Sequence, residues 1–251
     1  MSGDGALRAA FESAASLRDH SAEVAWYASR LPRDVGTLLD AMAGTGSMLL
    51  PLLTAGFNVH GAEASETALA RCSARLAAAG RSTQLFRQSI TALNLPFRYG
   101  AAFICGGAFQ SLTHRAAALD ALLRVRAHLI DPGLLLLDLF VPEEAAHPPG
   151  APVVELSVLA PADGSQITRR SETVIDVPRR RSIVYSRFEQ RDRTGVLARE
   201  DHRREITWYA EDEIVALVGD AGYRDIHCEA LPWRSGARAR HFAVSARSQP
   251  R

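Results

Sequence analysis

Short apolar segments alternate with helical segments through the first half of this 251-residue chain. Both faces of these predicted strands are apolar, which is typical of a parallel sheet that helices cover on both sides. The alternation of strand and helix therefore predicts an α/β fold with a doubly wound, Rossmann-like sheet. The predicted strands are 37–40, 58–62, 84–87, 101–105 and 134–140, and the helical segments between them are 47–56, 65–80 and 116–129.

The pattern changes after the fifth predicted strand. Residues 153–208 lack a convincing helix, and polar and apolar positions alternate between turn signals such as Asp163-Gly164 and Thr194-Gly195. Alternation of this kind is typical of an antiparallel sheet with one solvated face. We therefore expect an antiparallel β insertion after strand five, which serves as a lid or as a dimerisation surface.

Three parts of the chain are predicted from this organisation. Residues 1–34 form helices that cover the substrate or cofactor, and residues 153–208 form the insertion. The main domain combines residues 35–152 with residues 209–247, where a helix over 211–221 precedes two final strands.

The charge composition excludes several kinds of partner and chemistry. Basic and acidic residues nearly cancel, at 29 and 28, so no overall field attracts a nucleic acid or a membrane surface. Lysine is absent, which excludes a lysine Schiff base and a P-loop lysine. Acidic residues separate the arginine runs of the insertion, so a solvated sheet face is favoured over an RNA-binding face. We expect no nucleic-acid partner and no membrane partner.

Cysteine usage and the N-terminal residues favour a cytoplasmic protein. Cys72, Cys105 and Cys228 are far apart and odd in number, and their spacing matches neither a disulfide framework nor a metal site. Residues 1–10 lack the apolar stretch of a secretory signal, and no apolar run is long enough to span a bilayer. We expect a soluble, cytoplasmic protein without a bound metal.

A glycine-containing loop joins the first predicted strand to the helix that follows it. Gly44 and Gly46 let the backbone approach a ligand that a Cβ atom would push away. The next helix points its free N–H groups toward the same place. Glu63 ends the neighbouring strand, where a carboxylate can accept hydrogen bonds from vicinal ribose hydroxyls. These features predict an adenosine-type ligand at the carboxyl ends of adjacent strands.

Leu49 argues against a dinucleotide in this loop. A dinucleotide-binding loop follows the pattern G-x-G-x-x-G, whose third glycine lets the helix pack close to the strand. Counted from Gly44, the third position is the bulky Leu49. The loop therefore favours a cofactor without phosphate groups over NAD or FAD, and it disfavours a nicotinamide oxidoreductase.

The loop and three further motifs resemble the class I S-adenosylmethionine-dependent methyltransferases. Residues 38–46 resemble the first motif of that family, acidic-x-Gly-x-Gly-x-Gly, and residues 59–65 resemble its second, with Glu63 as the ribose-binding acid. Residues 126–134 resemble its turn into the fifth strand, and residues 208–214 resemble its helix before the last two strands. The resemblance implies a seven-stranded sheet whose last strand is antiparallel, with S-adenosyl-L-methionine as the cofactor.

The resemblance also implies which residues hold the cofactor. In the family, the first acid and the loop backbone hold the methionine moiety, residues after strand three contact adenine, and residues after strand four line the open side. N-terminal aromatic residues often close over the methionine end; Tyr27 is the candidate here, although its helical spacing fits core packing as well. The implied positions are Tyr27, Asp40, Ala41, Met42, Gly44, Gly46, Glu63, Ala64, Gln88, Ser89, Ile90, Cys105 and Gly106.

Two of these positions depart from the family's pattern. Met42 replaces the usual first glycine of the loop. Ser89 stands where an aspartate commonly receives the adenine amino group, and a hydroxyl makes a weaker, uncharged contact. Both departures bear on cofactor affinity.

Asp138 and His114 are the candidate catalytic residues. Asp138 lies near the end of the fifth predicted strand and could orient an acceptor; the alternative is a carboxylate that caps the strand end. His114 follows the loop after the fourth strand and could act as a base; the alternative is a loop or helix-capping histidine. Cys105 has no recognisable partner base, so a small apolar residue is favoured there over a nucleophile.

The resemblance implies an enzyme that transfers a methyl group from S-adenosyl-L-methionine to an amine or hydroxyl of a small metabolite. The alternative is a non-catalytic methyltransferase-like protein that acts as a regulatory or assembly partner. A small-molecule acceptor and a possible homodimer are the expected partners.

Overall fold

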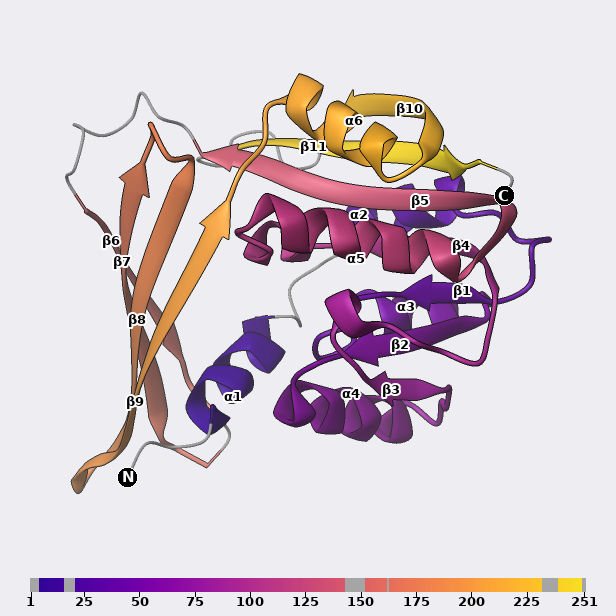
Figure 1. Ribbon diagram of the computed structural model, residues 1–251. Helices are drawn as coiled ribbons and strands as arrows, with labels where there is room; N and C mark the ends of the chain where they lie inside the picture. The colour runs from indigo at the N-terminus through magenta and orange to yellow at the C-terminus, as the bar shows by residue number, and fades with distance from the viewer. Residues whose placement is uncertain (1–4, 16–20, 143–151, 162, 232–238, 250–251) are drawn as a thin grey trace. The chain divides into compact units, whose positions relative to one another are not determined.

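The chain divides into two compact units, one of residues 1–19 with 144–207 and the other of residues 20–143 with 208–251. Each unit contains its own sheet (Figure 1). The computed structural model describes residues 5–15, 21–142, 152–161, 163–231 and 239–249.

The larger unit is built on a seven-stranded sheet. Its strands are β1 (Leu38–Asp40), β2 (Val59–Glu63), β3 (Leu85–Arg87), β4 (Tyr99–Ile104), β5 (Leu129–Pro142), β10 (Tyr223–Ala230) and β11 (Ala239–Ser248). Their order across the sheet is β10-β11-β5-β4-β1-β2-β3. The neighbours from β5 to β3 are parallel, whereas β11 runs antiparallel to both β5 and β10. The predicted doubly wound sheet with an antiparallel last strand is confirmed.

Helices pack on both faces of this sheet. Successive strand residues point to opposite faces. Leu38 therefore packs in one apolar cluster with side chains of α2, α3 and α4, and its neighbour Leu39 packs in a second cluster with side chains of α5 and α6. Burial on both faces is the physical reason for the continuous apolar strands seen in the sequence. The helices are α2 (Ser21–Arg30), α3 (Leu49–Thr54), α4 (Glu66–Ala78), α5 (Arg115–Ala127) and α6 (Glu211–Asp220), with short 3₁₀ turns η1 (Ile90–Ala92) and η2 (Ala108–Ser111).

Strand β5 begins earlier than the sequence predicts, at Leu129 rather than at residue 134. Leu129 pairs with Tyr99 and Leu134 pairs with Ala101, so β5 contains extra residues at this point and the register shifts. The turn signal in the sequence, Asp131-Pro132-Gly133, lies inside this irregularity. The predicted start of the strand was wrong, because residues 129–133 already belong to β5, where the pairing of Leu129 depends on β4.

The smaller unit is a four-stranded antiparallel sheet with one helix, α1 (Ala6–Ala15). The helix packs on the sheet through Phe11, whose ring lies 5.7 Å from that of Phe188. The buried carboxylate of Glu200 accepts a hydrogen bond of 2.9 Å from the Leu7 N–H in the first turn of the helix. The strands are β6 (Val153–Leu159), β7 (Gln166–Asp176), β8 (Arg181–Asp192) and β9 (Gly195–Thr207), in that order across the sheet. The predicted insertion after strand five is confirmed.

The two N-terminal helices belong to different units. Helix α1 is grouped with the antiparallel sheet, and α2 is grouped with the seven-stranded sheet. The covering role predicted for residues 1–34 stays a prediction. None of the helices in the described ranges has the length and hydropathy that crossing a membrane requires.

Leu49 packs close to the sheet because the facing strand carries a glycine. Leu49 is the first residue of α3 and is fully buried. A Cβ atom at Gly61, in β2, would lie 2.7 Å from Leu49 Cδ1 and 2.9 Å from Leu85 Cδ2. Dinucleotide-binding loops place the glycine of such a contact in the helix. In this chain the strand supplies the glycine and the helix supplies the bulky residue, so the same close packing is reached.

Gly61→Ala is expected to lower the free energy of unfolding by about 1–3 kcal/mol, because the added methyl group overpacks the contact with Leu49. The matched control is Gly219→Ala in α6, where the new Cβ would meet only Ile226 Cδ1 at 3.8 Å and alanine is the better helix former. Urea unfolding of the two variants beside the native protein measures both effects. Equal midpoints for Gly61→Ala and the native protein would contradict this account of the packing.

Candidate functional site

The carboxyl ends of four neighbouring strands meet at one edge of the seven-stranded sheet. Asp40 is the last residue of β1, Glu63 ends β2, Cys105 follows β4, and Asp138 lies in the second half of β5. In open α/β sheets, ligands bind outside the carboxyl ends of the strands. These four side chains therefore mark the candidate site.

Asp40 is a buried carboxylate without a hydrogen-bond partner. Its side chain is fully buried, and neither carboxylate oxygen has a donor in hydrogen-bond geometry. Burial raises the pKa of Asp40 to about 8. The backbone N–H of Met42, which is near the carboxylate without meeting hydrogen-bond geometry, offsets part of the rise, and Glu63 adds to it. An isolated buried carboxylate destabilises the fold. Its presence here indicates a ligand that supplies donors or positive charge.

The glycine loop after β1 is held by Glu63. One oxygen of its carboxylate accepts a hydrogen bond of 3.0 Å from the Gly44 N–H, and the other accepts one of 2.7 Å from the Ser65 N–H. Gly44 and Gly46 both have left-handed backbone, with φ of 55° and 79°. A Cβ atom at Gly46 would lie 2.7 Å from Cys72 Sγ, whereas one at Gly44 would meet no protein atom within 4 Å. Gly46 is therefore required for packing, and Gly44 borders open space.

The glycine loop and the loop after β4 line a pocket of about 220 Å³. Met42, Gly44, Cys105 and Gly106 were all predicted as cofactor-binding residues, and the structure brings them together in this pocket. Asp40, Ala41 and Glu63, which were also predicted, do not line it, and Asp40 and Ala41 are buried in the core. The full lining consists of Glu23, Met42, Ala43, Gly44, Ser47, Met48, Cys105 and Gly106.

Glu23 is a pocket residue that the sequence analysis missed. It lies in α2, is almost fully buried and lines the pocket. A signal was present, because Glu23 stands at helical spacing from Trp26 and Tyr27 and so shares their buried face. An acid on the apolar face of a helix is uncommon unless it has a function or a partner.

Asp138 joins two elements of the site by hydrogen bonds. Its carboxylate accepts bonds from the backbone N–H groups of Gly106, at 2.9 Å, and Gly107, at 2.7 Å. It also accepts a bond of 2.9 Å from the hydroxyl of the fully buried Tyr27. This geometry supports the strand-capping alternative for Asp138 and the core-packing alternative for Tyr27. Their predicted roles toward acceptor and cofactor stay predictions.

Burial raises the pKa of the Cys105 thiol well above its ordinary value, and the carboxylates of Asp40, Asp138 and Glu23 add to the rise. The thiolate is the nucleophilic form of cysteine. Cys105 is therefore a neutral thiol in the pocket wall, which supports the interpretation that it is not a nucleophile.

The residues predicted to contact adenine have local hydrogen bonds of their own. The Gln88 side chain donates to the Asn94 carbonyl, at 3.1 Å, and accepts from the Asn94 N–H, at 2.7 Å. Ser89 caps η1, where its hydroxyl accepts a bond of 3.4 Å from the Thr91 N–H, and Ile90 is buried. Contact of these residues with adenine stays a prediction.

The other predicted residues are exposed. Ala64 follows β2 at the surface. His114 occupies the N-cap position of α5, makes no capping hydrogen bond with its side chain, and does not line the pocket. This position agrees with the alternative that His114 is a loop or helix-end histidine. Its role as a base stays a prediction. Across the part of the chain that the structure describes, no three histidine, cysteine or acidic side chains gather to hold a metal ion.

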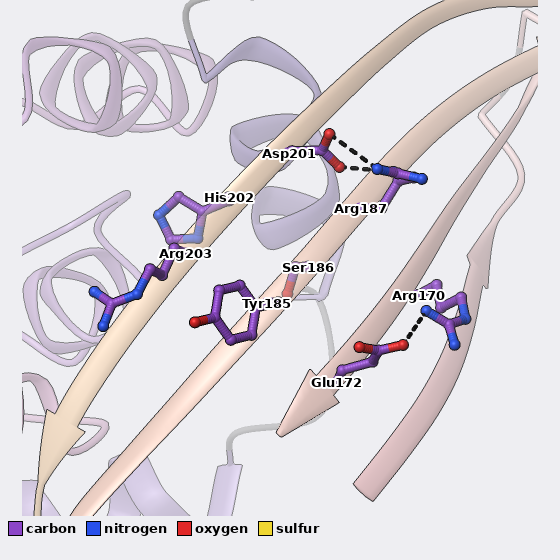
Figure 2. A pocket seen from close by; sticks show the side chains of 8 residues that line it. All are labelled: Arg170, Glu172, Tyr185, Ser186, Arg187, Asp201, His202 and Arg203. Carbon is purple, nitrogen blue, oxygen red and sulfur yellow. Dashed lines mark hydrogen bonds and ion pairs between the residues drawn. The ribbon is translucent and has the colours of Figure 1, made fainter. Parts of the chain in front are cut away.

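A second hollow lies on the antiparallel sheet of the smaller unit (Figure 2). Its volume is about 390 Å³, and it includes Tyr185 and three arginines. The arginines are neutralised by neighbours: Arg187 pairs with Asp201 at 2.7 Å, Arg170 with Glu172 at 2.5 Å, and Arg203 with Glu205 at 2.7 Å. The hollow lacks buried acids of the kind found in the first pocket.

Comparison with known proteins identifies the class of the larger unit. Residues 38–130 match the family model described as a methyltransferase domain. No curated protein matches this chain. This region is thus similar to a methyltransferase domain, which agrees with the resemblance to the class I S-adenosylmethionine-dependent methyltransferases.

Solved methyltransferase structures share the complete fold. An S-adenosylmethionine-dependent methyltransferase from Clostridium acetobutylicum ATCC 824 superposes with a TM-score of 0.75 at 14% identity, over 96% of this chain and 100% of that chain. The sugar N-methyltransferase KedS8 from Streptoalloteichus sp ATCC 53650 gives 0.73 at 21% identity, over 92% and 89%. CalS10, an amino pentose methyltransferase from Micromonospora echinaspora, gives 0.68 at 23% identity, over 94% and 96%. Each superposition covers more than nine tenths of this chain, so this chain shares its fold with these three methyltransferase structures.

Asp40→Asn is expected to stabilise the ligand-free protein, increasingly as the pH rises from 5 to 8. The folded protein holds a proton on Asp40 up to about pH 8, whereas an unfolded aspartate loses it near pH 4, so the native protein loses stability across this window. The difference between variant and native protein should grow by at most about 1.4 kcal/mol per pH unit.

Urea unfolding at several pH values measures this difference. Asp163→Asn is the control, because hydrogen bonds with Ser165 lower the pKa of Asp163 and keep it ionised throughout the window. A stability difference for Asp40→Asn that does not change between pH 5 and 8 would show that the Asp40 carboxyl is not held protonated.

Proposed function

We propose that this chain is an S-adenosyl-L-methionine-dependent methyltransferase that methylates an amine of a small molecule, with amino sugars as the first acceptor class to test. The observation that carries the proposal is Asp40, which is buried at the end of β1 with both oxygens unpartnered. The cofactor has an ammonium group and a sulfonium centre, and either can stabilise the ionised carboxylate.

The residues around Asp40 fit this cofactor. Gly44 borders open space where a larger residue would project, so the loop backbone can approach the ligand. The Glu63 carboxylate accepts two backbone hydrogen bonds. Because a carboxylate can accept about four hydrogen bonds, two acceptor positions remain for the two ribose hydroxyls. When bound, the cofactor supplies an already activated methyl group. The protein's part is to position the acceptor and to exclude water.

Glu23 supports an amine as the acceptor. Its buried carboxylate lines the pocket and, like that of Asp40, lies close enough to Cys105 to raise the pKa of that thiol. An amine reaches the enzyme largely as an ammonium ion, which a carboxylate attracts and from which it can accept a proton. KedS8 and CalS10, whose names specify a sugar N-methyltransferase and an amino pentose methyltransferase, also favour this acceptor class.

Titration calorimetry tests cofactor binding. The native protein is expected to bind S-adenosyl-L-methionine and, near pH 7, to release about one proton as Asp40 ionises. Parallel titrations in two buffers with different ionisation enthalpies measure that proton. Asp40→Asn should bind more weakly and release no proton, whereas Asp163→Asn should behave as the native protein. Absence of binding to the native protein would overturn the proposed function.

Glu23→Gln is expected to lower kcat/KM for an amine acceptor by about 100-fold or more, because the glutamine cannot accept the proton. The loss should be smaller at high pH, where more of the amine arrives neutral, and cofactor affinity should change little. Formation of S-adenosyl-L-homocysteine with a panel of amino sugars and their hydroxyl analogues measures the rates. Glu66→Gln is the control, since Glu66 is an exposed residue of α4 paired with Arg87.

Two results would contradict the role of Glu23. Full activity of Glu23→Gln on amines would show that Glu23 does not accept a proton in the reaction. Turnover of the hydroxyl analogues alone would show that the acceptor is a hydroxyl and not an amine. Cofactor binding without turnover of any acceptor would instead favour a regulatory or assembly role for the chain.

A further inference from the structure

One face of helix α4 contacts the glycine loop after β1. Cys72 is fully buried in α4, and its Sγ lies 2.7 Å from where a Cβ atom at Gly46 would be. Arg75 donates a hydrogen bond of 2.9 Å from Nη1 to the Thr45 carbonyl. Residues three apart are neighbours on a helix surface, so Cys72 and Arg75 form one contact face that supports Thr45 and Gly46.

The glycine loop has an inner and an outer side. Gly44 and Ser47 line the pocket, whereas Thr45 and Gly46, which stand between them, do not. The contacts with Cys72 and Arg75 place Thr45 and Gly46 on the outer side, toward α4. The Thr45 carbonyl, which bonds to Arg75, is therefore held outside the pocket.

Strand β2 holds the first half of the loop through other peptide groups. The Ala43 N–H donates to the Ala62 carbonyl at 2.9 Å, and the Gly44 N–H donates to the Glu63 carboxylate at 3.0 Å. Neither bond involves the Thr45 carbonyl. Arg75 thus restrains the second half of the loop, which the bonds from β2 do not reach.

Thr45 stands between two glycines, so its peptide groups are the part of the loop that most needs a restraint. Gly44 and Gly46 both have left-handed backbone. Glycine has more accessible backbone conformations than any other residue, and ordering it costs more conformational entropy. A loop that is already ordered in the free protein does not pay this cost when a ligand binds.

The guanidinium of Arg75 is committed to this bond although carboxylates lie nearby. Burial raises the pKa of the Cys72 thiol to about 11; Asp40 and Glu63 add to the rise and Arg75 opposes it, so these charges lie near one another. Within the described residues, however, Arg75 forms no ion pair. Arg75 therefore restrains the loop without occupying the carboxylates that face the ligand.

We propose that Arg75 is a positioning residue for cofactor binding. By holding the Thr45 carbonyl outside the pocket, it keeps the glycine loop in the conformation that S-adenosyl-L-methionine binds. Arg75 does not line the pocket, so it acts through the loop and not by contact with the ligand. The inference rests on the proposed function, because it takes the loop to be the binding site of this cofactor.

Cofactor affinity tests the role of Arg75. Arg75→Met keeps a long, unbranched side chain with good helix propensity but removes the donor. Its dissociation constant for S-adenosyl-L-methionine, measured by titration calorimetry, should rise about 10-fold, which corresponds to one hydrogen bond from a charged donor. Arg75→Lys should recover most of the affinity, because an ammonium group can donate to the same carbonyl. Arg124→Met is the control, at an exposed arginine of α5 that pairs with Asp120.

Hydrogen–deuterium exchange of the ligand-free protein tests the loop itself. Residues 41–48 should exchange faster in Arg75→Met than in the native protein, whereas Arg75→Lys and Arg124→Met should exchange at close to the native rate. Exchange in β5 should be the same in all four proteins, because the restraint is local. A purely structural role for Arg75 would instead speed exchange throughout the larger unit and leave the affinity of the folded protein unchanged.

The outcomes separate this inference from the proposed function. If the native protein binds the cofactor, an unchanged affinity or an unchanged loop exchange in Arg75→Met would overturn the role of Arg75 alone. Equal losses of affinity in Arg75→Met and Arg75→Lys would also overturn it, since the donated bond would then not be the cause. Absence of cofactor binding to the native protein would overturn the proposed function and the role of Arg75 together.

Discussion

The carboxylate of Asp138 connects segments of the larger unit that are distant in the chain. Its three donors come from the loop after β4 and from Tyr27 in α2. The loop carries Cys105 and Gly106, and α2 carries Glu23, so both sides of the pocket depend on this one acceptor. Hydrogen bonds to an ionised acceptor are stronger than neutral ones, and loss of a buried acceptor leaves its donors unsatisfied. Burial raises the pKa of Asp138, and its three donors oppose that rise, which helps it to act as this acceptor.

Three buried acids lie at or near the pocket. Glu23 lines it, and Asp40 and Asp138 lie close enough to raise the pKa of Cys105. Such an arrangement destabilises the ligand-free fold, and strained or unfavourable groups of this kind persist where a ligand or a reaction uses them. A cationic ligand would convert the unfavourable field into binding energy. The site therefore gains affinity from the interactions that make the empty protein less stable.

The two sheets of the chain differ in how their faces are covered. The parallel sheet is buried on both faces by helices, so its strands are apolar at consecutive positions. In the antiparallel sheet, α1 packs through Phe11 on one face, and the opposite face carries ion pairs such as Arg170–Glu172 and Arg187–Asp201. Strand β6 is the exception, because its exposed face is apolar.

The sequence by itself determined the doubly wound sheet, the antiparallel insertion and the edge at which the site lies. These follow from local periodicity and from the order of short motifs, which neighbouring residues encode. Only the tertiary structure showed that Glu23 enters the pocket, that Gln88 is closed on Asn94, and that Gly61 makes room for Leu49. Contacts between distant residues decide such details: Tyr27 and Asp138 are 111 positions apart, and Leu7 and Glu200 are 193 apart. Periodicity describes which face of an element is buried, but it does not specify which side chain lies opposite, and that pairing decides what the carboxylates of this site can bind.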